Sequence, residues 1–332
     1  MESLNSTIFT NTSIHTIDTK INVEEIIFGF LSLVGTLTSV VNTLMFWKLR
    51  FKDQVYKYYL ISSIFDTLYM FSIFLYTLIA CGYPCEKLNK NGLIKFIYLI
   101  AVYDYLTSCI AIYNILIEIF VTTQRYFLIS RKKTLQNLNP NLVMFITILV
   151  SLLYYSPIVF LKKICFTANI GFTMVYTNFG LSEVGRLVPI VLSSIRLILA
   201  SVILLIANIF TLIEFKKYLK QKRLMKFSNL NSNLNSSYSG PRKQVKDKKM
   251  KNVTQMLISI AFVYSIGTLP YALYYGLSEL FKTNNFIIDK ILYSFGGVGF
   301  RLIIILKILI FYKYNKIFQE EFRLIVKKLW EK

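Results

Sequence analysis

The stretch DYLTSCIAIYNILIEIFVTTQRYFLISR, from Asp104 to Arg131, decides the fold. Small and polar side chains recur in it at intervals of three or four residues: Asp104, Thr107, Ala111, Asn114, Glu118, Thr122 and Arg125. This spacing places them on one face of an α-helix, and the other faces are mainly Ile, Leu, Val, Phe and Tyr. A polar edge of this kind turns into a bundle of lipid-embedded helices. We therefore expect the rest of the chain to pack around this helix.

The composition points to a polytopic membrane protein. The chain has 332 residues, of which 55% are hydrophobic and 17% charged, whereas soluble domains average about 25% charged residues. The apolar residues lie in blocks long enough to cross a bilayer core of about 30 Å. The prediction is an all-α bundle of seven transmembrane helices, over 25–47, 57–80, 93–127, 141–161, 185–215, 252–278 and 286–312.

Three polar or basic segments flank these spans. Residues 1–24 form a tail with two glycosylation sequons, at Asn5 and Asn11. Residues 216–251 are basic with an Asn/Ser-rich centre, which predicts a disordered loop. Residues 313–332 have apolar side chains on one face and Lys/Arg off it, which predicts a short amphipathic helix lying parallel to the membrane and contacting its lipid.

The net charge of +21 reports topology rather than nucleic-acid binding, because the cations gather in alternate loops. Their distribution places the N-terminus outside and the C-terminus inside, which predicts a plasma-membrane protein with an extracellular tail. One His and four Cys are too few to suggest a metal site. We find no nucleophile–base pair and no phosphate-binding loop, so we expect neither an enzyme nor a cofactor.

Several residues stand where one receptor family places its motifs. Asn42 lies in the first span, Asp66 in the second, Asn114 and Arg125-Tyr126 in the third, Pro270 in the sixth and Tyr312 at the end of the seventh. With the order and topology of the spans, this pattern resembles the rhodopsin-like (class A) family of G-protein-coupled receptors over about 25–330.

The resemblance implies a mechanism. A ligand would enter from outside among spans three, five, six and seven, and the sixth span would pivot at Pro270 to open a cleft beside Arg125 for a heterotrimeric G protein. It assigns G-protein coupling to Arg125, Tyr126 and Tyr312. It assigns the activation core to Asn42, Asp66, Asn114, Glu118 and Pro270.

The chain also departs from the family. Gln124 replaces the acid before the arginine, and Ile308-Leu309 replaces the Asn-Pro of the seventh span. We therefore predict that Arg125 is held loosely at rest, that the receptor signals without ligand, and that Gln124→Glu lowers this signal. These departures suggest a divergent invertebrate-type chemosensory or peptide receptor, and leave open a receptor that binds but does not signal.

The family's disulfide between extracellular loops would here join Cys85 to Cys165, with Cys81 as the competing partner. This pairing is implied by the resemblance, because the family's Cys at the outer end of the third span is missing.

Individual residues have simpler interpretations. Lys307 either extends its ammonium to the membrane interface or pairs with Asp66. Asn114 and Glu118 either belong to an activation core or only join helices by hydrogen bonds. Arg125 is either a coupling residue or a membrane anchor.

The rival functional class is an ion or solute transporter or channel. Intramembrane charges suit such a path, and the chain has five that qualify: Asp66, Glu118, Arg196, Arg301 and Lys307. Against it, the sequence has no internal repeat and no paired broken helices. A light receptor is disfavoured because Leu302 stands where opsins place their lysine.

The expected ligand pocket contains Asp104, Thr107 and Arg301. Thr107 stands where aminergic receptors of the family place an aspartate, which argues against a monoamine. Arg301 lies eleven residues before Tyr312, about 20° away around a helix, so we expect it to face inward at ligand depth. A buried guanidinium needs a partner. We expect that partner to be Asp104, either in a purely structural pair or in a pair that opens to bind the acidic group of a ligand such as a peptide or a small organic acid.

Overall fold

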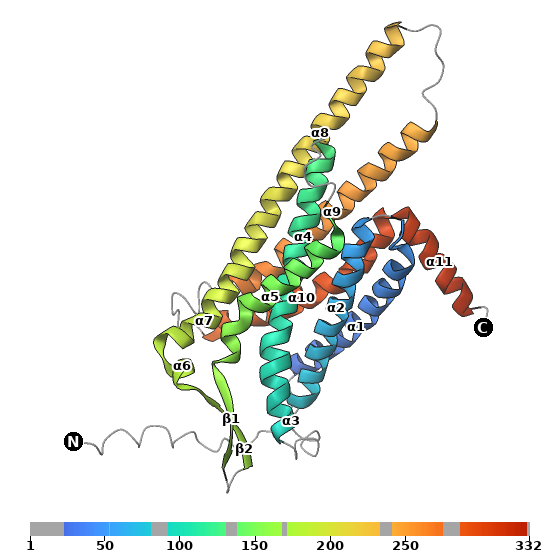
Figure 1. The fold of residues 1–332 in the computed structure, drawn as a ribbon. Helices are drawn as coiled ribbons and strands as arrows, with labels where there is room; N and C mark the ends of the chain where they lie inside the picture. The colour runs from blue at the N-terminus through green and yellow to red at the C-terminus, as the bar shows by residue number, and fades with distance from the viewer. Residues whose placement is uncertain are drawn as a thin grey trace.

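The computed structural model describes residues 23–52, 54–80, 92–130, 138–167, 171–232, 241–274 and 286–330. Nearly all of them are helical (Figure 1). In chain order the elements of the first half are α1 (Val23–Leu49), α2 (Gln54–Ala80), α3 (Gly92–Ile97), the π-helical segment η2 (Tyr98–Leu106), α4 (Thr107–Ile129) and α5 (Pro140–Val159). Segments α3, η2 and α4 follow one another directly, so the third predicted span is continuous.

The second half begins with a β-hairpin and returns to helices. Its elements are β1 (Lys162–Thr167), β2 (Gly171–Tyr176), α6 (Asn178–Leu181), α7 (Glu183–Ser194), the π-helical segment η3 (Ile195–Leu199), α8 (Ala200–Ser232), α9 (Pro241–Tyr274), α10 (Phe286–Tyr314) and α11 (Lys316–Trp330). The hairpin lies at one end of the bundle and α11 at the other (Figure 1). We call these the hairpin end and the α11 end.

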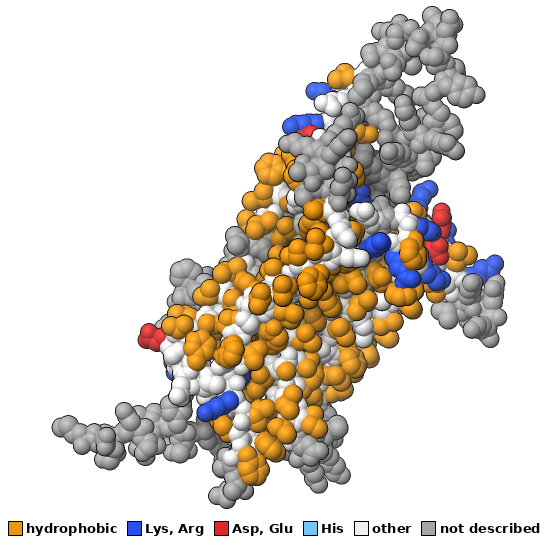
Figure 2. All heavy atoms as spheres, viewed as in Figure 1, with side chains coloured by type: hydrophobic (Ala, Val, Ile, Leu, Met, Phe, Trp, Pro, Cys, Tyr) orange, Lys and Arg blue, Asp and Glu red, His pale blue; other side chains and the backbone are white. Residues whose placement is uncertain are grey.

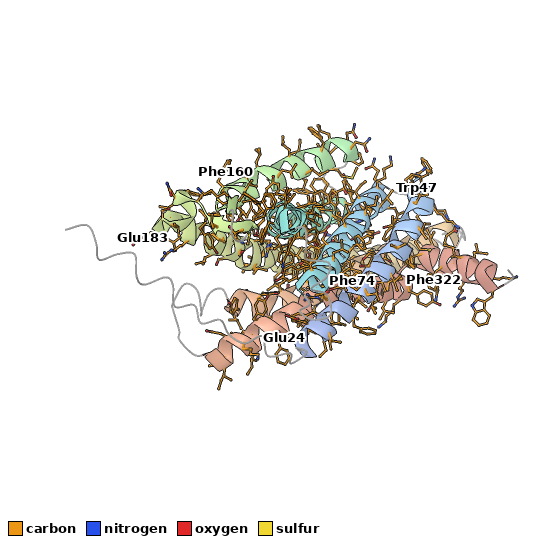
Figure 3. The ribbon with its side chains drawn as sticks, turned by 90° about the horizontal axis from the view of Figure 1, so that it is seen from below. Glu24, Trp47, Phe74, Phe160, Glu183 and Phe322 are labelled. Carbon is orange, nitrogen blue, oxygen red and sulfur yellow. The ribbon has the colours of Figure 1, made fainter. Side chains whose placement is uncertain are left out.

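Helix α4 is the centre of the bundle, as the sequence predicted. It contacts α2, α5, α8 and α9, and Figure 3 shows the helix that continues into it, in teal, end-on among the other helices. In the most apolar window of Gly92–Ile129, 67% of the residues are buried, against at most 44% in any other candidate span. The predicted polar stripe faces inward, since its buried members are Thr107, Ala111, Asn114, Glu118 and Thr122.

The outer surface is apolar over the middle of the molecule. Figure 2 shows a broad belt of hydrophobic side chains, with Lys, Arg, Asp and Glu gathered toward the two ends. On α5, for example, Phe145, Leu149 and Leu153 are exposed. Within the described residues, six helices are long and apolar enough to cross a membrane. The protein is therefore a multi-pass membrane protein built as an all-α bundle.

The sixth predicted span, 252–278, falls on α9. The apolar part of α9 within the described residues is Ile258–Tyr274, which is shorter than the other candidate spans at about 25 Å. Residues 275–285 lie outside the described part of the chain. The crossing of the membrane by α9, the count of seven spans and the orientation of the bundle therefore stay predictions.

The predicted disordered loop, 216–251, is wrong in its described parts. Helix α8 continues to Ser232 and α9 begins at Pro241, so only 233–240 lies outside the described residues. The flanks are rich in Lys, Gln, Leu and Met, which are strong helix formers. A helix already nucleated in the bundle extends into such sequence at little cost. Both helices reach beyond the rest of the bundle (Figure 1).

The hairpin is the one β element that we find in the described residues, and the sequence did not predict it. Strands β1 and β2 pair antiparallel, with Cys165 opposite Thr173 and Phe166 opposite Phe172. The two Phe rings meet with centroids 5.1 Å apart, a cross-strand contact that stabilises a short sheet. Gly171 has a φ of 82°, which glycine adopts without steric strain.

Two glycines allow α9 and α10 to approach closely. A Cβ atom added at Gly299 would lie 2.6 Å from the carbonyl oxygen of Gly267. At that distance the backbones themselves would have to separate. Small residues at helix contacts have this role in membrane bundles.

Candidate functional site

The hairpin end of the bundle contains a cavity of about 520 Å³. Side chains from α1, α2, η2, α4, α5, β1, β2, α7, η3, α9 and α10 line it. Its lining is rich in tyrosine: Tyr69, Tyr76, Tyr103, Tyr176, Tyr271 and Tyr293. It also holds charged groups of both signs, so it offers a ligand aromatic surface, hydroxyl groups and ionic partners together.

The structure places all three residues of the predicted ligand pocket on this cavity: Asp104, Thr107 and Arg301. Thr107 is buried and donates a hydrogen bond to the Tyr103 carbonyl within its own helix. Ligand binding by these residues stays a prediction, but their gathering in one cavity agrees with the face assigned to each from helical spacing.

Arg301 is held by neutral groups. Its Nε atom donates to the Ser32 hydroxyl at 3.0 Å, and Nη1 donates to the Gly297 carbonyl at 2.7 Å. Its guanidinium carbon lies 4.2 Å from the centre of the Phe28 ring. A guanidinium has five N–H donors, so these contacts leave donors for another group. The side chain is 8% exposed and lines the cavity. Arg301 is therefore ordered and desolvated before any ligand arrives.

The predicted pair between Asp104 and Arg301 is wrong. Among the described residues, Arg301 forms no ion pair, and Asp104 Oδ2 instead accepts a hydrogen bond from Lys162 Nζ at 2.7 Å. Lys162 is the first residue of β1, and the hairpin brings it over η2. The sequence analysis missed this partner because it did not predict the hairpin.

Two charged residues on the cavity belong to π-helical segments. Asp104 lies in η2 and Arg196 in η3. The guanidinium carbon of Arg196 lies 5.7 Å from the centre of the Tyr155 ring. π-Helical turns are rare and are frequently found at functional sites. A π-helical turn was not predictable from hydropathy, so the sequence analysis did not place Arg196 on the cavity.

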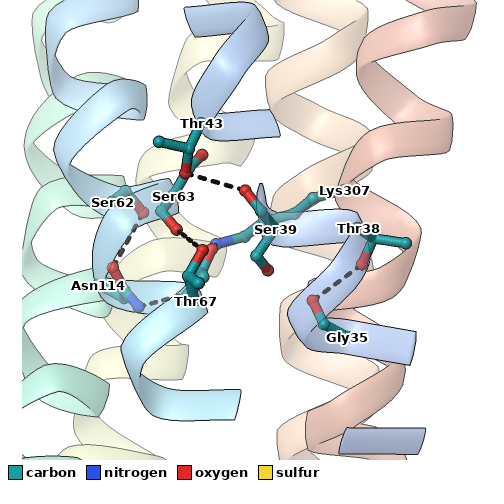
Figure 4. Close-up of polar contacts among 10 residues, drawn as sticks. Gly35, Thr38, Ser39, Thr43, Ser62, Ser63, Thr67, Asn114 and Lys307 are labelled. Atoms are coloured by element: carbon teal, nitrogen blue, oxygen red, sulfur yellow. Dashed lines mark hydrogen bonds and ion pairs between the residues drawn. The ribbon is translucent and has the colours of Figure 1, made fainter. Parts of the chain in front are cut away.

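A buried ion pair lies deeper in the bundle. Lys307 Nζ of α10 lies 2.8 Å from Asp66 Oδ2 of α2, with side chains 6% and 3% exposed. Asn114 Nδ2 of α4 donates to the other oxygen, Asp66 Oδ1, at 2.8 Å, and its own Oδ1 accepts from Ser62 at 2.9 Å (Figure 4). Of the two interpretations of Lys307, pairing with Asp66 is the one observed. We call Asp66, Lys307, Asn114 and Ser62 the polar core.

Two further members of the predicted activation core are also buried. Asn42 is 2% exposed and Glu118 is 3% exposed. The side-chain oxygens Asn42 Oδ1 and Glu118 Oε1 have no hydrogen-bond partner among the described residues. Pro270 lies within α9, where the prediction placed it.

The α11 end is closed by packed aromatic rings. Phe46 contacts Tyr56, Tyr59, Phe311 and Phe318 with ring centroids 4.8–6.1 Å apart. These rings join α1, α2, α10 and α11. The α11 end is therefore held together by packed aromatic side chains.

Asn315, which the sequence analysis missed, fixes the start of α11. Its Oδ1 accepts from the Phe318 backbone N–H at 3.2 Å, and its Nδ2 donates to the Tyr56 hydroxyl at 2.9 Å. An Asn before a helix is a preferred N-cap, and this signal was present in the sequence.

The predicted coupling residues also lie toward the α11 end. Arg125 and Tyr126 are in the last turns of α4, and the Tyr312 ring packs against Phe322 of α11 at 5.5 Å. Gln124 is buried, and its Oε1 has no partner within the described part of the chain. The predicted loose hold on Arg125 is not tested by these contacts.

Three residues that were predicted to carry a glycan or a disulfide lie outside the described residues. These are Asn5, Asn11 and Cys85. Cys165 carries a free thiol in the structure, so its bridge to Cys85 stays a prediction. Within the described ranges, no group of three or more His, Cys, Asp and Glu side chains is placed to hold a metal ion.

Comparison with models of known protein families found no match, and no curated protein matches the sequence. The fold and the polar features therefore define the class of this protein: an all-α, multi-pass membrane protein with a cavity at one end and a buried ion pair in its core.

Proposed function

We propose that this protein is a seven-span receptor of the rhodopsin-like type, which binds an extracellular ligand and activates a heterotrimeric G protein. One observation carries the proposal: a single central helix contributes to three regions. Its cavity end bears Asp104 and Thr107, its middle bears Asn114 in the polar core, and its other end bears Arg125. Such a helix can couple a ligand in the cavity to a partner at the α11 end.

The charge distribution supports an orientation with the cavity outside. Lys and Arg are concentrated in the segments that join the spans at the α11 end and in α11 itself. By the positive-inside rule that end faces the cytoplasm. In this orientation the tail with Asn5 and Asn11 is extracellular, the protein resides in the plasma membrane, and a G protein would contact Arg125, Tyr126 and Tyr312.

We propose that the ligand carries an acidic group which Arg301 binds. The partner predicted for Arg301, Asp104, is paired with Lys162 instead. Ser32 and Gly297 hold the guanidinium in place without neutralising it. A carboxylate can accept two parallel N–H bonds from such a group. A small organic acid or the carboxylate of a peptide fits a cavity of about 520 Å³ lined with tyrosine.

A transporter is the second candidate, and the buried charges of Asp66, Glu118 and Lys307 favour it. The packed rings around Phe46 favour the receptor, because they fill the space between α1, α2, α10 and α11 at the α11 end. Flux of small acids or protons into proteoliposomes discriminates the two. A transporter moves them without any G protein, whereas the receptor gives no flux above empty liposomes.

The test of the receptor is a screen of small acids and acidic peptides in cells that express several G-protein reporters. We expect an acid to activate one reporter, and Arg301→Gln to lower its potency at least tenfold at equal surface expression. Asp104→Asn is the matched control on the same cavity and should change potency less. An unchanged potency in Arg301→Gln would rule out the acidic-ligand assignment while leaving the receptor intact.

A further inference from the structure

Glu118 is a third ionisable side chain in the buried centre of the bundle, and the proposed function does not use its charge. It lies on α4 four residues after Asn114, one helical turn further toward the α11 end. It is 3% exposed, and its Oε1 has no hydrogen-bond partner among the described residues. Asp66 differs, because both of its oxygens accept hydrogen bonds.

If Glu118 and Asp66 were both ionised, the negative charges in this part of the bundle would outnumber the positive ones. The titratable and charged groups that act on it are Asp66 and Tyr59 of α2, Tyr264 of α9 and Lys307 of α10. Lys307 is the cation of this group, and its ammonium is already bonded to Asp66 at 2.8 Å. Glu118 forms no ion pair among the described residues, and Arg125, seven residues further along α4, acts on Tyr59.

One ammonium therefore serves two buried carboxyl groups. A second carboxylate without its own cation is strongly disfavoured in such surroundings, and a buried acid of this kind binds a proton instead. The hydrogen bonds decide which acid does so. Asp66 accepts hydrogen bonds from Lys307 and Asn114, which stabilise its ionised form. Glu118 has a side-chain oxygen, Oε1, without a hydrogen-bond partner among the described residues.

We propose that Glu118 is a proton-binding site, a carboxylic acid held neutral in the centre of the bundle beside an ionised Asp66–Lys307 pair. The site exists whether the bundle signals or transports, so it is independent of the proposed function. Glu118 loses its proton when a cation approaches it. A movement of α10 that carries Lys307 from Asp66 toward Glu118 would release that proton, which couples the arrangement of the helices to pH.

The proton is observable by infrared spectroscopy of the purified protein in lipid nanodiscs. A protonated carboxylic acid has a C=O stretching band that shifts in D₂O, and we expect this band in the wild type. Glu118→Gln should remove it. Asp104→Asn is the control, because that acid is paired with Lys162 and partly exposed, and the band should stay.

The pH dependence of unfolding is a second test of the proposal, independent of the infrared band. The folded state binds one more proton than the unfolded state once the pH exceeds about 4.3, where a glutamate in the unfolded chain ionises, so stability must fall as pH rises from there until Glu118 itself ionises in the folded state. The unfolding equilibrium constant in SDS should rise about tenfold per pH unit relative to that of Glu118→Gln. An identical pH dependence in the two proteins, or a band that disappears in Asp66→Asn and survives in Glu118→Gln, would overturn the proposal.

Discussion

Two ion pairs, one in each half of the bundle, are almost equal in length and differ in burial. Lys162–Asp104 at the cavity measures 2.7 Å with side chains 24% and 25% exposed, and Lys307–Asp66 in the polar core measures 2.8 Å with 6% and 3% exposed. Distance alone would rank them as equivalent. Burial separates them, because solvent screens the first pair and scarcely reaches the second.

This difference in burial indicates which of the two ion pairs can open. The cavity pair joins a short hairpin to a π-helical segment, so it can open at little cost. The pair in the polar core joins α2 to α10 and is completed by Asn114 of α4, so breaking it leaves an uncompensated charge among three helices. The cavity half is suited to admit a ligand, and the core half to hold the helices in register.

The strongest test of this contrast removes one member of the buried pair. Asp66→Asn or Lys307→Met alone should destabilise the bundle by about 3–5 kcal/mol, because the remaining charge stays buried. The double variant Asp66→Asn/Lys307→Met should recover most of this loss. Unfolding in SDS gives the free energy of unfolding of the wild type, the two single variants and the double variant. If the loss in the double variant equals the sum of the two single losses, the two side chains are not coupled.

The next effect concerns the aromatic closure of the α11 end. Phe318 is fully buried and contacts Phe46 and Phe311. Phe318→Ala should destabilise the protein by about 3 kcal/mol and loosen α11, which hydrogen exchange would detect. Phe145→Ala on the outer face of α5 is the matched control, since that ring is exposed. Equal effects of the two variants would contradict the placement of α11.

A smaller effect is expected at the contact of α9 with α10. Gly299→Ala places a Cβ 2.6 Å from the Gly267 carbonyl oxygen, so the helices must separate, at about 1–3 kcal/mol. Gly92→Ala is the comparison, because its Cβ would meet the Phe96 ring at an ordinary 3.5 Å. Thermal unfolding in detergent should rank Gly299→Ala well below Gly92→Ala, and the reverse order would be inconsistent with this close approach.

The smallest effect belongs to the cavity pair. A double-mutant cycle with Asp104→Asn and Lys162→Gln should give a coupling energy below about 1 kcal/mol, and high salt should reduce it further. A coupling as large as that of Asp66 with Lys307 would remove the contrast between the two halves.

The central helix was predictable because its pattern is long and periodic. Apolar residues over more than six turns, with a polar stripe at intervals of three and four, leave one orientation in which the polar face is buried. Thr107, Asn114 and Glu118 were placed inside from this pattern alone, and they are buried in the structure.

Contacts between distant segments were predicted only where each partner had a strong reason to be buried. Asp66 and Lys307 both lie deep in apolar spans, so their pairing was one of two interpretations of Lys307. Lys162 lies between two predicted spans, and no pattern indicated that a hairpin would bring it to Asp104. The assignment of Arg301 to Asp104 failed for this reason.

Helix ends and local distortions were the least predictable. The extensions of α8 and α9 beyond the apolar spans depend on helix propensity, a weaker signal than hydropathy. The segments η2 and η3 depend on packing around the cavity, which no local pattern specifies.

Nucleotide exchange on purified heterotrimeric G proteins tests the proposed function most directly. The protein in nanodiscs is mixed with a panel of G proteins, and the wild type is compared with Arg125→Ala, whose residue lies at the end of α4 opposite to the cavity. We expect the wild type to accelerate exchange on at least one G protein above empty nanodiscs even without ligand, and Arg125→Ala to abolish the acceleration at unchanged stability. Equal exchange by the wild type, Arg125→Ala and empty nanodiscs across the whole panel would contradict the receptor.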